Sequence, residues 1–385
     1  MSKSKWNLGI KDFLLIALST LTGVIICEIA LFSMDKIGVM PDVFRKINAD
    51  QYNFSPETAQ GLYFSHPFNS YELVPSYEHN GWAHINSLGF RGEEFEKIRK
   101  PDTYRIVALG DSTTYGIWNQ YDKTYPFQLE KLLKERLTYD KIEVINAGLV
   151  SATTAEALIR FYFKVLDLKP DMLVFYSGLS DIIPRIFNNF RDDYSHFRKN
   201  PHHEFSIRTI SYLARLVGYV FETRGHGLVN VSLADHTWRL ENLPTTDRKR
   251  IENFKSTNSR AFERNLQQLL LAAKANNIKV ALATFAYNQK LRKWTPAVPE
   301  ELWGIGISEH NAVITRLAEK NNVPLCRFAE IASDNVDFFG GEAIHLSDYG
   351  NGKLAECFAD SMEIEIKSKL SRLARWPHPG VGNPW

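Results

Sequence analysis

The chain is poor in cysteine, which makes up only three of its 385 residues. Cys27, Cys326 and Cys357 are too widely spaced to match a zinc-type motif, so we expect no metal site. Cys326 and Cys357 can pair in an oxidising compartment, but nothing in the sequence requires that bond. We therefore expect free, buried thiols.

The chain also carries little net charge, because 46 Lys and Arg residues offset 44 Asp and Glu residues to leave +2. A nucleic-acid-binding domain needs a basic face to neutralise phosphates, so nucleic acid is not an expected partner. Internal repeats and low-complexity tracts are absent from the sequence. Hydrophobic residues make up 44% of the chain, which fits a globular core.

One long apolar run is present, at residues 13–32. A membrane-spanning helix needs roughly 20 mostly apolar residues, and this run is that long. Lys3, Lys5 and Lys11 precede it and no small-residue cleavage site follows, as in an uncleaved signal anchor. We expect Glu28, inside the run, to reach the interface, be protonated or pair with another helix. The alternative is a buried helix of a soluble protein.

Composition divides the chain into an anchor, a lead-in, a main domain and a tail. The ranges are 1–34 for the cytoplasmic tail and anchor, 35–103 for the extended lead-in, 104–375 for the domain, and 376–385 for the tail. Basic residues lie on both sides of the apolar run, so the positive-inside bias is small. The simpler topology keeps the short N-terminal tail in the cytoplasm and the domain outside it.

From residue 104 the pattern alternates between short apolar strands and amphipathic helices. The predicted strands are 104–109, 141–145, 172–176, 279–285 and 323–328. The predicted helices are 124–137, 153–166, 259–276, 308–321 and 347–374. Alternation of this kind predicts a five-stranded parallel sheet with helices on both faces, an α/β fold of three layers. The pattern lapses over about 184–256, which indicates a lid or other insertion after the third strand, with one helix near 207–221.

Two polar motifs lie away from the strand ends. Residues 86–92, reading NSLGFRG, indicate a turn within the lead-in and a structural role. Residues 193–196 include His196, but no predicted strand end places this histidine at the sheet edge. We interpret residues 193–196 as a lid or packing element.

Polar residues gather where the predicted strands end. Ser112 follows the first strand, Gly148 ends the segment after the second, residues 178–181 follow the third, and His345 precedes the last helix. The carboxyl ends of parallel strands share one edge, so a single crevice can collect all four. Taken alone, Ser112 is as consistent with a helix cap as with a nucleophile.

Together these residues fit acyl transfer. The Ser112 hydroxyl needs a base to accept its proton, and His345 can serve. Glu342, three residues before His345, can hold the imidazole in one tautomer. The oxyanion needs donors, and the amides of Ser112 and Gly148 with the hydroxyl of Ser180 are the candidates.

Four blocks in order resemble the SGNH (GDSL-type) hydrolases. The blocks are Gly-Asp-Ser at 110–112, Asn-Ala-Gly at 146–148, Gly-Leu-Ser-Asp at 178–181 and Glu-Ala-Ile-His at 342–345. The resemblance implies a flavodoxin-like α/β/α sandwich and ester or acyl chemistry without a cofactor. It implies Ser112 as nucleophile, His345 as general base, and Ser112, Gly148 and Ser180 as the oxyanion hole. Ser180 stands where the family has Asn, and Glu342 where it has Asp.

These observations predict a membrane-anchored serine esterase or acyltransferase acting outside the cytoplasm. Its expected partners are the membrane, through the N-terminal helix, and an acylated glycan or similar ester. The alternative is a catalytically weak binding or assembly module of the cell envelope, which the replacement at Ser180 favours.

Overall fold

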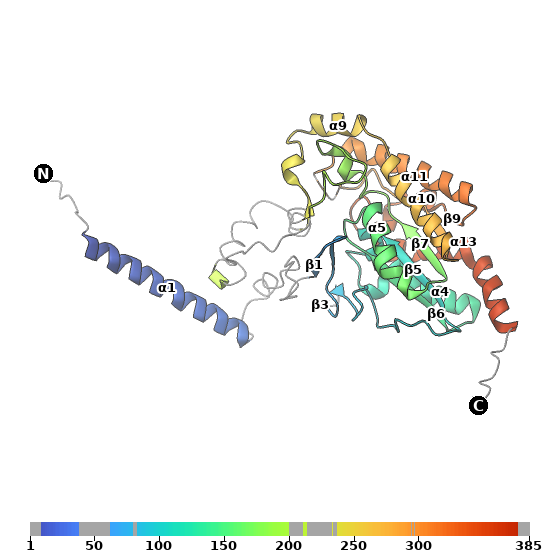
Figure 1. Ribbon diagram of the computed structural model, residues 1–385, viewed down its shortest axis with the longest axis horizontal. Coiled ribbons are helices and arrows are strands. Elements are labelled where there is room, and N and C mark those ends of the chain that lie inside the picture. The colour runs from blue at the N-terminus through green and yellow to red at the C-terminus, as the bar shows by residue number, and fades with distance from the viewer. Residues whose placement is uncertain are drawn as a thin grey trace, which may run out of the picture.

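A computed structural model describes residues 9–37, 62–79, 83–199, 211–213, 233, 237–293, 295 and 297–375. An α/β domain holds most of these residues, and the N-terminal helix α1 stands apart from its sheet (Figure 1). The expected helix near 207–221 and the tail at 376–385 lie outside the described residues, apart from 211–213.

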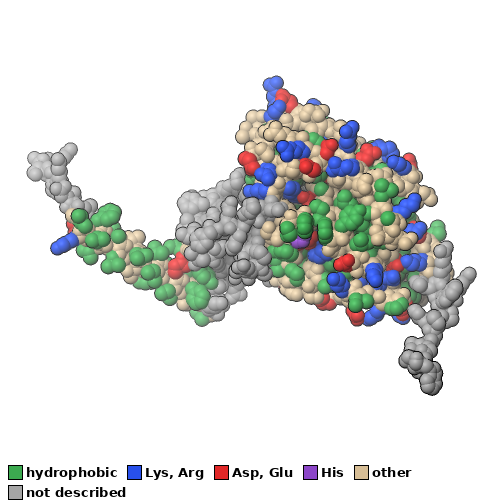
Figure 2. All heavy atoms as spheres, viewed as in Figure 1, with side chains coloured by type: hydrophobic (Ala, Val, Ile, Leu, Met, Phe, Trp, Pro, Cys, Tyr) green, Lys and Arg blue, Asp and Glu red, His purple; other side chains and the backbone are tan. Residues whose placement is uncertain are grey.

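The apolar run forms α1 (Ile10–Lys36), a helix of 27 residues. Residues Ile10–Met34 are long and apolar enough to cross a membrane, a test that a signal sequence also passes. None of this span is buried inside the protein, so the alternative of a buried core helix does not hold. The large apolar side chains of α1 are exposed on its surface instead (Figure 2), with Phe13 72% exposed and Ile26 61% exposed.

The carboxylate of Glu28 on α1 is paired with the insertion. It accepts hydrogen bonds from the amides of Tyr212 at 2.8 Å and Leu213 at 3.1 Å, and from the hydroxyl of Ser211. The rings of Phe32 and Tyr212 meet edge to face, with centroids 5.9 Å apart. The acid within the apolar run therefore has its partners in the same chain.

Five parallel strands form the central sheet, in the order β6-β5-β7-β8-β9. Their bounds are β5 Tyr104–Gly110, β6 Ile142–Gly148, β7 Met172–Tyr176, β8 Lys279–Ala283 and β9 Leu325–Cys326. In chain order this is 2-1-3-4-5, the flavodoxin-like order. The predicted α/β fold with a five-stranded parallel sheet is confirmed.

Alternate residues of the strands bury into two separate cores. Ile106 and Ala108 of β5 pack with α4 and α13, whereas Val107 and Leu109 pack with α5, α10 and α11. The helix bounds are α4 Tyr125–Leu137, α5 Thr154–Arg160, α10 Arg260–Ala275, α11 Glu300–Asn321 and α13 Asp348–Arg375. The period-two alternation of β5 thus sets the three layers (Figure 1).

Helix α11 begins at Glu300, eight residues before the expected start at Ser308. Residues 300–307 include Gly304 and Gly306, and glycine is a poor helix former. At Gly306 the helix meets Ile182 so closely that a Cβ would lie 2.5 Å from its Cδ1. Packing therefore outweighs helix propensity over the first two turns.

Cys326 and Cys357 form a disulfide, with their Cα atoms 5.5 Å apart. The expectation of free thiols was wrong for this pair, because β9 and α13 bring together residues 31 apart in sequence. Cys27 on α1 is free and exposed.

The lead-in contains two antiparallel hairpins that cover one end of the domain. They are β1 (Tyr63–His66) with β2 (Ser70–Leu73), and β3 (Glu78–His79) with β4 (Ala83–His84). Buried side chains of these strands pack with Tyr115, Leu149 and Val150 in a third apolar cluster. The lead-in therefore packs on the loops that follow β5 and β6.

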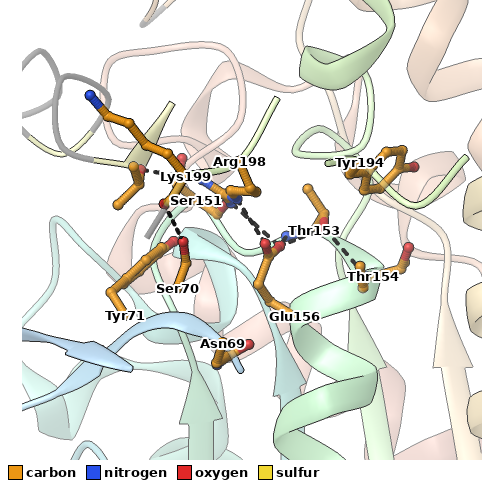
Figure 3. Close-up of polar contacts among 12 residues, drawn as sticks. Asn69, Ser70, Tyr71, Ser151, Thr153, Thr154, Glu156, Tyr194, Arg198 and Lys199 are labelled. Carbon is orange, nitrogen blue, oxygen red and sulfur yellow. Dashed lines mark hydrogen bonds and ion pairs between the residues drawn. The ribbon is translucent and has the colours of Figure 1, made fainter. Parts of the chain in front are cut away.

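A buried polar network ties the insertion to the same loops (Figure 3). Arg198 pairs with Glu156 of α5 at 2.7 Å and donates to the carbonyl of Ser151 at 2.5 Å. The hydroxyl of Ser70 on β2 donates to the carbonyl of Lys199 at 2.6 Å. This described part of the insertion is thus packed against the domain. Farther along, the insertion forms the short helix α9 (Asp247–Lys255).

Candidate active site

The nucleophile candidate lies on a sharp turn between β5 and the short helix α3 (Ser112–Tyr115). Asp111 is the N-cap of α3, and its side chain accepts from the Thr113 amide at 3.0 Å. Because Asp111 caps the helix, the hydroxyl of Ser112 is not used as a cap. Ser112 therefore does not cap α3, and its hydroxyl makes a different contact.

That contact is with His345, whose Nε2 lies 2.7 Å from Ser112 Oγ. Both side chains are buried, Ser112 being 6% exposed and His345 2% exposed. His345 lies in the loop before α13, which closes with a hydrogen bond from the Gly340 amide to the His345 carbonyl at 2.8 Å. The fold thus brings together two residues 233 apart in sequence.

Glu342 completes the group on the other side of the imidazole. Its Oε1 lies 2.7 Å from His345 Nδ1 and also accepts from the His345 amide at 2.5 Å. A carboxylate at Nδ1 favours the tautomer protonated there, which leaves the Nε2 lone pair facing the Ser112 hydroxyl. Oε2 of Glu342 is buried and accepts no hydrogen bond from the described residues.

Trp118 is a neighbour of His345 that the sequence did not reveal. Its Nε1 lies 3.2 Å from His345 Nδ1, and the two rings meet edge to face at 6.2 Å. An Nδ1 that carries a proton for Glu342 has no lone pair to accept from the indole. The geometry thus offers two uses of Nδ1, and the shorter distance favours Glu342.

The amide donors expected for the oxyanion differ in their surroundings. Ser112 is the first residue of α3, so its amide has no acceptor within the helix. The Gly148 amide instead donates to Oδ1 of Asn146 at 2.9 Å. A Cβ at Gly148 would lie 2.2 Å from the Tyr115 amide nitrogen, so this glycine permits the close approach of α3 to β6.

The hydroxyl of Ser180 is directed to Asp111. Its Oγ lies 3.3 Å from Asp111 Oδ2, which also accepts from Ser177 at 2.9 Å. Asp111 therefore accepts hydrogen bonds from two serine hydroxyls of the loop after β7, and it also caps α3. The expected role of Ser180 at the oxyanion stays a prediction.

Asp181, the last residue of the same block, is fully buried. It accepts from the amide and hydroxyl of Thr154 at 2.8 and 2.5 Å and from the Tyr194 hydroxyl at 2.8 Å. Burial raises the pKa of Asp181 from 3.8 to about 7, against the lowering effect of these bonds. Asp181 therefore connects the loop after β7 to α5 and to the insertion.

His196, the second histidine weighed from the sequence, packs within the insertion. Its Nε2 lies 2.9 Å from the Pro184 carbonyl, and its Nδ1 accepts from the Arg191 amide at 3.1 Å. The packing interpretation of His196 agrees with these contacts. Among the described residues, no group of three or more His, Cys, Asp or Glu side chains is placed to hold a metal ion.

A flavodoxin-like sheet with a Ser-His pair at its carboxyl edge is the arrangement of an SGNH-type hydrolase. The model of the GDSL-like lipase/acylhydrolase family matches residues 108–353, more than half of the chain. The chain belongs to this family.

Three individual proteins that the chain resembles share 15–32% sequence identity with it. An uncharacterized lipoprotein, YqeF, of Bacillus subtilis is 32% identical over 126 residues, which are 32% of this chain and 44% of that protein. A lipase/acylhydrolase from Enterococcus faecalis is 18% identical, covering 68% of this chain and 97% of its own, with a TM-score of 0.40. An acetyl xylan esterase from Geobacillus stearothermophilus is 15% identical, covering 69% and 97%, with a TM-score of 0.40.

Proposed function

We propose that this protein is a serine esterase in which Ser112 is the nucleophile, His345 the general base and Glu342 the group that orients His345. The observation that carries the proposal is the 2.7 Å contact between Ser112 Oγ and His345 Nε2. Ser112 Oγ attacks the ester carbonyl while His345 takes its proton and then gives it to the leaving alcohol. Water, activated by His345, then releases the acid from Ser112.

The tetrahedral oxyanion is proposed to meet the Ser112 amide first. Gly148 and Ser180 are the further candidates, each bonded to a neighbour in the resting site, Asn146 and Asp111 respectively. For either to serve, its hydrogen bond to that neighbour must break and its N–H or O–H must turn to the oxyanion. Loss of one oxyanion donor costs roughly 10²- to 10³-fold in rate, so the turnover rate depends on whether these donors reach the oxyanion.

The substrate is proposed to be a small acyl ester outside the cytoplasm, on a glycan or a similar carrier. The Cys326–Cys357 disulfide supports an oxidising compartment, where such bonds persist. The apolar α1, long enough for a membrane span, supports retention of the domain at the membrane. Identification of a relative as a lipoprotein agrees with this placement. The family's chemistry supports an ester as the reacting bond.

The test is labelling of the full chain by a fluorophosphonate probe and turnover of p-nitrophenyl acetate. Ser112→Ala is expected to lose both, because no other group is proposed to attack. Ser195→Ala, which removes an exposed serine of the insertion, is the matched control and should behave as wild type. Equal labelling of wild type and Ser112→Ala would rule the proposal out.

A second function has one specific observation in its favour. Two of the three expected oxyanion donors are bonded to other groups, which suits a fold kept for binding rather than for turnover. In that case wild type would bind an acylated glycan without hydrolysing it, and Ser112→Ala would bind it equally well. Calorimetry with an acetylated oligosaccharide, run beside the turnover assay, separates the two functions.

A further inference from the structure

The lead-in motif at 86–92 contacts the sheet next to the nucleophile loop. Asn86 Oδ1 accepts from the amides of Leu88 and Phe90 at 3.1 and 3.0 Å, which closes the expected turn. Arg91 then forms an antiparallel bridge with Asn146, its amide donating to the Asn146 carbonyl at 3.3 Å. The turn therefore delivers Arg91 to the end of β6.

The side chain of Arg91 binds the segment that follows the candidate nucleophile. Its Nη1 donates to the carbonyls of Tyr115 at 2.7 Å and Gly116 at 2.9 Å, and its Nη2 to that of Asn119 at 2.6 Å. The guanidinium lies 4.2 Å from the centre of the Tyr115 ring, and Arg91 is only 3% exposed. A single planar group thus fixes the end of α3 and the loop that carries Trp118.

That loop in turn holds the segment carrying His345. The side-chain amide of Asn119 donates to the Leu346 carbonyl at 3.2 Å and to Asp348 Oδ1 at 2.9 Å. Its Oδ1 accepts from Asn351 of α13 at 3.1 Å. A continuous set of hydrogen bonds therefore runs from Arg91 through Asn119 to the residue next to His345.

We propose that Arg91 is a positioning residue of the active site, which holds Ser112 and His345 in register from outside the hydrolase fold. The inference rests on the proposed esterase function. The family match begins at residue 108, so Arg91 lies in the part of the chain that the match does not cover. The lead-in then helps to position the active-site residues, in addition to connecting the domain to α1.

The geometry requires a guanidinium. Arginine offers five donors in a rigid fork, which can reach carbonyls on both sides of a loop at once. A lysine ammonium is a single point with a flexible stem, so it can meet only part of the set. Loss of the fork frees the loop from 115 to 119 and, through Asn119, the loop of His345.

The experiment compares wild type, Arg91→Lys and Arg91→Ala as full chains in detergent, with p-nitrophenyl acetate as substrate. We expect kcat to fall on the order of 10- to 100-fold in both variants while KM changes little, because reacting groups are misplaced rather than lost. Guanidinium ion, added to Arg91→Ala below denaturing concentration, is expected to restore part of kcat. Arg99→Ala is the matched control, since Arg99 lies in the lead-in but binds the Thr103 carbonyl and Asp171, not the nucleophile loop.

Two readouts keep this inference separate from the proposed function. In wild type we expect a downfield Nδ1 proton of His345 in the NMR spectrum, lost or shifted in Arg91→Ala but retained in Arg99→Ala. Wild type without any turnover would remove the esterase proposal, and the NMR comparison would still decide the role of Arg91. Arg91 variants with unchanged kcat and unchanged His345 signal would overturn the inference, as would losses matched by Arg99→Ala.

Discussion

The candidate site has two halves whose hydrogen bonds are arranged differently in the resting structure. In the proton-relay half, the two ring nitrogens of His345 each lie 2.7 Å from a partner, Nε2 from Ser112 Oγ and Nδ1 from Glu342 Oε1. In the oxyanion half, Gly148 and Ser180 direct their protons to Asn146 and Asp111. The first half is assembled in the resting structure, whereas Gly148 and Ser180 would have to exchange partners to act in the proposed oxyanion hole.

The difference follows from what each half must do without a substrate. A serine, a histidine and a carboxylate satisfy one another, so burial of all three leaves few unmet hydrogen bonds. Oxyanion donors have no acceptor until the substrate arrives, and a buried donor without a partner costs about 1–3 kcal/mol. Asn146 and Asp111 supply those acceptors in the resting site. Comparison of the two halves therefore separates the groups proposed to move the proton from the groups proposed to stabilise the oxyanion and so to set the rate.

The largest effect is expected in the proton-relay half, at His345. His345→Ala should lower kcat for p-nitrophenyl acetate by roughly 10⁴- to 10⁶-fold, because His345 is the proposed acceptor of the Ser112 proton. The matched control is His196→Gln, which alters the second candidate histidine and should keep activity. The opposite ranking of these two variants would move the base to the insertion.

Glu342→Gln is expected to cost roughly 10²- to 10⁴-fold in kcat. The amide carries no charge to stabilise the imidazolium, and its NH₂ group can turn Nδ1 into an acceptor. Glu342→Asp keeps the charge but withdraws it by one methylene, so a loss of about tenfold is expected. Steady-state kinetics of the pair would show a Ser-His dyad instead if both variants matched wild type.

In the oxyanion half, Ser180→Asn is expected to raise kcat by roughly tenfold or more, since a carboxamide reaches farther than a hydroxyl and donates without relying on Asp111. Ser180→Ala should lower kcat, because it removes the donor. Measuring both on the same ester tests whether Ser180 limits the rate. An Asn variant no faster than wild type would mean that other donors already suffice.

Much of this site was predictable from the sequence, and the reason is local. Each strand end carries its own signal, so Ser112, residues 178–181 and His345 could be assigned to one edge once five strands were counted. Glu342 was found because it lies three residues from His345, within one loop.

The rest depended on contacts between distant segments. Trp118 and Asn119 follow α3, where no sequence pattern marks them, and only the fold shows that they contact the His345 loop. The disulfide was missed for the same reason, since β9 and α13 are adjacent only in three dimensions. Gly148 was a reasonable donor from its position, but its amide binds the side chain of Asn146, two residues away on the same strand, and the sequence does not specify that side-chain contact.

The acid beside the oxyanion half gives a prediction for stability against pH. The pKa of Asp181 is raised from 3.8 to about 7, so the folded protein keeps a proton that the unfolded chain releases. Stability should therefore fall as pH rises from about 4 to about 7 and then level off, by an amount on the order of a few degrees in melting temperature. Asp181→Asn should flatten this slope. A variant with the wild-type slope would assign the pH dependence to other groups.

The smallest effect is expected at Trp118, and it decides how Nδ1 of His345 is used. If Nδ1 carries a proton for Glu342 at 2.7 Å, the indole N–H at 3.2 Å gains little from it. Trp118→Phe keeps the ring and removes only the N–H, so kcat should stay within about threefold of wild type. A tenfold or greater loss would mean that Nδ1 accepts from Trp118. His345 would then carry its proton on Nε2, where it could not take the proton of Ser112. The proton-relay half would in that case also have to rearrange before reacting, and the contrast between the two halves would disappear.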